Sequence, residues 1–179
     1  GIESGAVASL SVPHGVERIE PMGSDAVVVG SAGEDLHFTG IDLDALPSTA
    51  QHFVLEGASQ GELRSHGFFY RADGEDAGVM GLPVAGPARP GWRHLVDGSA
   101  SVVFIRNADD AFAPLGRLDA GEPNAEGDDC VASCIDWYGN ARPLFIDSRI
   151  FALMGYELVE GAEEGDRIRE RRRVDFTPR

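Results

Sequence analysis

Short apolar and β-branched runs, separated by turn residues, recur along the whole chain. The first set of runs occupies residues 16–23, 25–31, 35–44 and 50–56. Helical periodicity is nearly absent, and 23 glycines and 10 prolines interrupt the chain too often for long helices. Short runs divided by turns at this spacing are typical of an up-and-down antiparallel sheet. The pattern therefore predicts an all-β protein.

Two further sets of runs follow the first. The second set occupies residues 66–72, 78–85, 100–107 and 112–120, and the third occupies residues 143–147, 149–158 and 167–176. The second run of each set is an apolar stretch that carries a glycine, as expected for a strand packed on both faces. These stretches are residues 26–30, 78–82 and 151–155. The sequence thus contains an internal repeat of sheet-sized units.

Tandem four-stranded sheets with apolar inner strands and polar outer strands are typical of β-propeller blades. We therefore predict an all-β fold of antiparallel four-stranded sheets repeated as blades, with a β-sandwich as the alternative. The third set has one run fewer, so we expect an incomplete propeller of about two and a half to three blades, where a ring needs at least about four. The blades are expected at residues 16–56, 66–120 and 142–176, after a flexible segment at 1–15 and with a loop insert at 121–141. The chain is then a fragment or a processed product, and the remaining blades of the same protein are among its partners.

The charge of the chain limits its partners. Asp and Glu number 30 against 15 basic residues, which gives a formal net charge of −15. Such a surface repels the phosphates of nucleic acids, so we expect no nucleic-acid binding. No apolar run approaches the roughly 18 residues of a membrane span, so we expect no membrane insertion.

The sequence offers no cofactor or metal motif. The five histidines lack an H-x-x-x-H spacing, and no lysine is present to serve a phosphate-binding loop. The acidic pairs Asp109-Asp110 and Asp128-Asp129 do not fit a calcium-binding loop. We therefore predict no cofactor and no metal.

The two cysteines, Cys130 and Cys134, lie close together in the sequence. Their spacing is one residue longer than that of a C-x-x-C redox pair, and a zinc site built from cysteine alone would normally need more ligands. A local disulfide suits an exported protein. Free thiols and a redox or metal role are the alternatives.

Four stretches of the chain carry a resemblance to a known family. They are VERIEPMGSDAVVVGSAGEDLHFTGIDL, GELRSHGFFYR, SASVVFIRN and DWYGNARPLFIDSRIFALMGYELVEG. These stretches resemble the C-terminal part of bacterial secreted proteins with a C-terminal β-propeller domain distantly related to WD40. The resemblance spans roughly residues 16–176, but no Trp-Asp pair ends a blade and no Gly-His pair opens one. It implies an extracellular or cell-envelope protein and carries over no catalytic residue.

The long connections are expected to lie on one face of the propeller. Strand direction alternates in an antiparallel blade, so the connections at 57–65, 86–98 and 121–142 should share a face, opposite the tight turns. Loops of this length are usually functional, and Trp, Tyr and Arg dominate binding hot spots. The candidate binding residues are Trp92, His94, Trp137, Tyr138, Asn140, Arg142, Arg64 and His66. In the alternative interpretation, the tryptophans only fill gaps between blades.

The sequence supports a binding role better than a catalytic one. Our first hypothesis is a non-catalytic binding or scaffold module that uses the loop-rich face to engage a protein or a glycan. The alternative is a hydrolase or lyase that acts at a propeller channel through acidic residues and His66 or His37. Ser65 and His66 are adjacent, and neighbours on a strand point to opposite faces, so they make a poor nucleophile–base pair. A purely structural segment is the third hypothesis.

Overall fold

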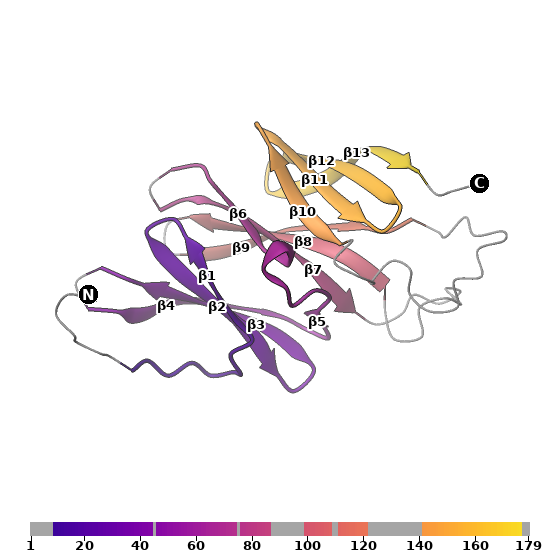
Figure 1. The fold of residues 1–179 in the computed structure, drawn as a ribbon. Coiled ribbons are helices and arrows are strands. Elements are labelled where there is room, and N and C mark those ends of the chain that lie inside the picture. The colour runs from indigo at the N-terminus through magenta and orange to yellow at the C-terminus, as the bar shows by residue number, and fades with distance from the viewer. Residues whose placement is uncertain are drawn as a thin grey trace.

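The computed structural model describes residues 9–44, 46–74, 76–86, 99–108, 111–121 and 141–176. These residues form three antiparallel β-sheets that follow one another along the chain (Figure 1). One short 3-10 turn is the only helical element in the described ranges. The predicted all-β class is confirmed.

Sheet 1 contains four strands in sequence order. They are β1 (Arg18–Met22), β2 (Asp25–Ala32), β3 (Asp35–Asp42) and β4 (Ser48–Leu55). Gly23 and Gly33 make the first two turns with φ values of 69° and 64°, a left-handed conformation that favours glycine. This sheet agrees with the prediction from the first set of runs.

Sheet 2 has an interrupted first strand. Its strands are β5 (Ser59–Gln60), β6 (Phe69–Ala72), β7 (Gly78–Gly86), β8 (Ser99–Ala108) and β9 (Ala111–Asp119). Both β5 and β6 pair with β7, and the 3-10 turn η1 (Ser65–Gly67) lies between them. The sequence predicted a strand from residue 66, but His66 belongs to η1, so that boundary was wrong.

Sheet 3 has four strands, so the prediction of three was wrong. They are β10 (Arg142–Ile146), β11 (Arg149–Met154), β12 (Glu157–Glu164) and β13 (Arg167–Asp175). The run at 149–158 contains a turn at Gly155 and Tyr156, where Gly155 has a φ of 57°. Apolar residues continue on both sides of this turn, which hides it in the sequence pattern.

Sheet 2 is the middle layer of the stack (Figure 1). One core joins sheets 1 and 2 through residues such as Phe38 and Met80, and a second joins sheets 2 and 3 through residues such as Phe104 and Val159. Strands that hold the same position in their sheets also contact one another. Among the first strands, β6 contacts β1 and β10, and among the last strands, β9 contacts β4 and β13. The sheets therefore stack face to face, with their first strands at one edge.

Two of the repeated glycines allow close approach between layers. A Cβ atom at Gly81 would lie 2.7 Å from Cβ of Pro143 in sheet 3. A Cβ atom at Gly30 would lie 1.8 Å from the carbonyl oxygen of Gly15, which packs on sheet 1. Gly155, the third glycine of the repeat, has a different role because it forms a turn. The repeated glycine is therefore required by packing in two sheets and by backbone conformation in the third.

Candidate functional site

The first strands of the three sheets form a continuous edge, which we call the first-strand edge. It consists of β1, the segment from β5 to β6, and β10, and β10 contacts both η1 and β6. Polar side chains gather along it: Arg18, Glu62, Arg64, His66 and Arg142. This edge is the candidate functional site.

Pro83 explains why the first strand of sheet 2 leaves the sheet. The carbonyl oxygen of Pro83 accepts a hydrogen bond from the Gly61 N–H at 3.0 Å. In an antiparallel sheet, the N–H and the carbonyl of one residue point to the same neighbouring strand. Pro83 therefore has a carbonyl for that strand but no N–H to donate to it. The hydrogen-bond ladder between β5 and β7 therefore loses a donor at Pro83. Residues 61–68 leave the sheet at this point.

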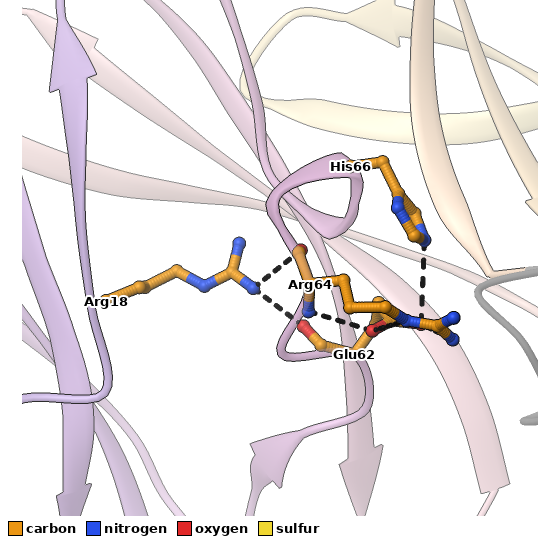
Figure 2. Close-up of polar contacts among 4 residues, drawn as sticks. All are labelled: Arg18, Glu62, Arg64 and His66. Carbon is orange, nitrogen blue, oxygen red and sulfur yellow. Dashed lines mark hydrogen bonds and ion pairs between the residues drawn. The ribbon is translucent and has the colours of Figure 1, made fainter.

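Glu62 is the centre of the departing segment (Figure 2). Its side chain is only 7% exposed, and its carboxylate accepts hydrogen bonds from Nε (2.9 Å), Nη2 (2.8 Å) and the backbone N–H (2.8 Å) of Arg64. The hydrogen bonds from the Arg64 side chain lower the pKa of Glu62 from 4.5 to about 2, although burial opposes the shift. The same pairing raises the pKa of Arg64. The ion pair holds Arg64 in one orientation while leaving its side chain 51% exposed.

Arg18 ties this segment to sheet 1 (Figure 2). Its Nη2 donates to the carbonyl oxygens of Glu62 at 2.8 Å and Arg64 at 3.0 Å. The side chain is 5% exposed, and this burial lowers the pKa of Arg18. Arg18 therefore links two sheets through backbone carbonyls rather than through an ion pair with Glu62.

His66 and Arg142 complete the edge. Nε2 of His66 lies 3.6 Å from Oε2 of Glu62, which is too long for a hydrogen bond. Pro143 packs against Gly81, and Arg142 therefore begins β10 near η1. Nε2 of His66 and Nε of Arg142 are buried and have no hydrogen-bond partner in the described part of the chain. Both nitrogens are enclosed by the protein, whereas the Arg64 side chain is 51% exposed and open to a ligand.

A second polar feature lies between sheets 2 and 3. It is a cleft of about 590 Å³ lined by Arg71, Ala72, Asp73, Asp147, Ser148, Arg149, Ile150, Glu160, Gly161, Ala162, Glu163 and Arg171. Arg71 pairs with Asp73 and Glu163 at 2.8 Å, and Glu163 also pairs with Arg106. Carboxylates hold Arg71 and Arg149 in this cleft, as Glu62 holds Arg64 at the first-strand edge.

The structure brings together three of the residues that the sequence singled out. Arg64, His66 and Arg142 lie at the first-strand edge. The other candidate positions lie outside the described residues, and so do both cysteines: Trp92, His94, Trp137, Tyr138, Asn140, Cys130 and Cys134. Their predicted roles stay predictions.

Sequence reasoning missed Glu62 and Arg18. Arg18 shares the inward face of β1 with Met22, four positions away, but its burial depends on the distant segment at Glu62 and left no signal in the sequence. His37, named in the catalytic alternative, stacks with His14 and His52 on sheet 1, with ring centroids 5.3 and 5.2 Å away. Ser65 and His66 both belong to η1 rather than to a strand.

No protein-family model matches the chain, and neither a curated protein nor a solved structure matches it. Within the described ranges, no helix is long and apolar enough to cross a membrane. The same ranges contain no group of three or more His, Cys, Asp or Glu side chains that could hold a metal ion.

The depressed pKa of Glu62 predicts an acid-dependent loss of stability. The pKa lies near 2 in the folded protein and near 4.5 when unperturbed, so the unfolded chain takes up this proton first as the pH falls. The contribution is present above pH 4.5 and is lost toward pH 2. Because Arg64 is half exposed, solvent screening weakens the ion pair. We expect this pair to contribute about 1–2 kcal/mol to the free energy of unfolding.

Urea unfolding between about pH 5 and about pH 3 measures this effect. Glu62→Gln should have a smaller pH dependence than the parent chain, whereas Glu164→Gln, at an exposed ion pair, should keep the parent slope. Equal slopes for Glu62→Gln and the parent would contradict the role given to this ion pair.

Proposed function

We propose that the three sheets are consecutive blades of an incomplete β-propeller, of the type distantly related to WD40 that occurs in exported bacterial proteins. Face-to-face stacking and the contacts between strands of equal position support this arrangement. The first-strand edge then lines the centre of the propeller. An extracellular or cell-envelope location follows from the same resemblance.

The free faces of the end sheets support the presence of further blades. Ile19 is 63% exposed on the side of sheet 1 that faces away from sheet 2, and Ile146 is 53% exposed on sheet 3. Leu153 of sheet 3 is half-buried and faces away from sheet 2, as does Phe151, whose ring is buried under the Arg149 guanidinium at 4.7 Å. The remaining blades of the same protein would cover such faces.

The function that the geometry supports best is a non-catalytic binding or scaffold module that engages a protein or a glycan. The observation that carries this proposal is the first-strand edge. Arg64 is oriented by Glu62 and its side chain is 51% exposed, and the His66 side chain, 33% exposed, lies beside the same carboxylate. Guanidinium groups held in this way suit ligands that present carboxylate or clustered hydroxyl oxygens.

The alternative function, a hydrolase or lyase, is less well supported by the same residues. His66 lies near Glu62, as a general base and its orienting carboxylate would. However, the Glu62 carboxylate already accepts three hydrogen bonds from Arg64, and its distance of 3.6 Å from Nε2 of His66 is too long for the hydrogen bond that would orient the ring. A binding role is consistent with the Glu62–Arg64 ion pair, because the pair holds the Arg64 guanidinium in one orientation.

Binding to an acidic glycan tests the proposal. The shortest oligogalacturonate, the disaccharide, carries two carboxylates, so it meets far less repulsion from the net charge of −15 than a long polyanion does, and maltose is the neutral control. Isothermal titration should show binding of oligogalacturonate, and Arg64→Ala should weaken it about tenfold through the loss of a charge-assisted hydrogen bond. Arg149→Ala removes an arginine paired with Glu160 on sheet 3 and should leave the affinity unchanged. Equal weakening by both variants would contradict a site at the first-strand edge.

A further inference from the structure

Three of the five histidines form a stack on sheet 1. The ring centroids of His14 lie 5.3 Å from His37 and 5.9 Å from His52, and those of His37 and His52 are 5.2 Å apart. The rings are nearly parallel, with interplanar angles of 27°, 9° and 24°. His14 is far from the other two in sequence, so the stack joins separate parts of the chain.

The stack fastens a segment that we call the N-terminal strap, residues 10–15. Val12 of the strap packs on Ala26, Val28 and Ile41, an apolar patch on the face of sheet 1 that is turned away from sheet 2. The N–H of Gly15 donates to the carbonyl oxygen of Ser31 at 3.0 Å. The strap therefore covers an apolar patch that would otherwise be open to solvent.

The His37–His52 hydrogen bond of the stack depends on the protonation of the imidazoles. Nδ1 of His14 lies 2.7 Å from the Gly15 carbonyl oxygen and must donate, and Nε2 lies 2.8 Å from the Thr39 hydroxyl, which donates to a neutral ring and accepts from a protonated one. Nδ1 of His37 and Nε2 of His52 lie 3.1 Å apart, so one must carry a proton and the other must not. If both rings become cationic, this bond is lost.

The surroundings of the stack favour the neutral form. Burial, and then the neighbouring His37 and His14, lower the pKa of His52. The carboxylates near the three histidines in sequence are Glu17, Glu34, Asp35 and Glu56. Asp35 accepts the Gly57 N–H at 2.8 Å, and Glu17 accepts from Gln60 at 2.6 Å. No carboxylate contributes to the pKa shift of His52, so a proton added to this ring is repelled without compensation from a carboxylate.

We propose that the histidine stack is a pH-sensitive latch, and that acidification releases the N-terminal strap and uncovers the apolar patch at Ala26, Val28 and Ile41. This inference goes beyond the proposed binding function, because the latch lies on sheet 1, away from the first-strand edge. The strap-bound state holds fewer protons than the released state. It is therefore fully stable above about pH 6.5 and loses stability as the pH falls below that value.

Hydrogen exchange of the intact chain tests the latch. The N–H groups of Gly15 and Glu17 bond to the carbonyls of Ser31 and Val29, both at 3.0 Å, and report on the strap. After correction for intrinsic rates, their protection should fall at least about tenfold between about pH 7.5 and about pH 5. Amides in β7 and β8 should keep their protection, which separates release from unfolding.

Variants distinguish the latch from a passive contact. His37→Phe/His52→Phe keeps stacked rings and leaves His14 as the single imidazole of the stack, so cations can no longer accumulate there and the strap should stay protected at about pH 5. If that variant fails to keep the β7 and β8 amides protected, His52→Gln replaces it and should shift strap release to lower pH. Gly30→Ala should release the strap at every pH, because its Cβ would lie 1.8 Å from the Gly15 carbonyl oxygen. Equal strap protection of the parent chain at both pH values would overturn the proposal. So would release of the strap in the His37→Phe/His52→Phe variant at the pH at which the parent chain releases it.

Discussion

Replacement of Phe104 by alanine is expected to lower the free energy of unfolding by about 3–5 kcal/mol. Phe104 is fully buried in the core between sheets 2 and 3. Its ring meets that of Phe145 edge to face, with centroids 6.2 Å apart. Truncation removes apolar contacts from both sheets and leaves a cavity that neighbouring strands, fixed by their hydrogen-bond ladders, cannot fill. Urea unfolding followed by circular dichroism measures the loss.

The control for this prediction is Ile146→Ala on the exposed side of sheet 3. Ile146 is half exposed, and its truncation should change stability by no more than about 0.5 kcal/mol. A cost below about 1 kcal/mol for Phe104→Ala would mean that sheets 2 and 3 do not share this core.

Replacement of Arg18 by alanine is expected to cost about 2–4 kcal/mol, the second largest effect. Nη2 of Arg18 donates to the backbone carbonyls of Glu62 and Arg64, and the whole side chain is buried. Without the guanidinium, the buried Glu62 carbonyl loses this donor, and the Arg64 carbonyl depends on its other bond, from the Gly67 N–H. The segment that carries Glu62, Arg64 and His66 then loses its link to sheet 1.

Two variants separate this role from a general effect of charge. Arg18→Lys keeps the charge but cannot present the planar guanidinium, so it should recover only part of the stability. Arg149→Ala removes a half-exposed arginine from a solvent-screened ion pair and should cost much less than Arg18→Ala. If Arg18→Ala were as mild as Arg149→Ala in urea unfolding, the bridge between β1 and the departing segment would carry little of the stability.

The candidate site and the latch both depend on backbone features that a single residue imposes. Pro83 removes a donor from the first-strand edge of β7, and residues 61–68 leave the sheet there. Gly30 admits the carbonyl of Gly15, so the strap lies directly on β2. Both residues lie in strands whose sequences are ordinary apolar runs. Their effect depends on which segment of the chain packs against them in the fold.

Strand positions were predictable where turn residues interrupt the apolar runs. Gly23 and Gly33 mark turns that the sequence shows plainly, and sheet 1 was predicted with its four strands. The turn at Gly155 and Tyr156 was missed because Met154 before it and Leu158 after it continue the apolar pattern. Periodicity detects a turn only when polarity changes there.

The candidate site was predictable only in part. Arg64, His66 and Arg142 stood out because they lie in or beside long connections. Arg18 and Glu62 did not, because a charged residue in an acidic chain is normally a solvated one. Their burial depends on contacts between residues 44 positions apart, which no local pattern encodes.

The sequence by itself determined the all-β class and most of the strands, because turn chemistry and apolar runs are local properties of the chain. Only the tertiary structure decided which side chains meet: Arg18 with the carbonyls of Glu62 and Arg64, and His14 with His37 and His52. These contacts arise when sheets and strap pack together, and packing partners distant in sequence leave no periodic signal.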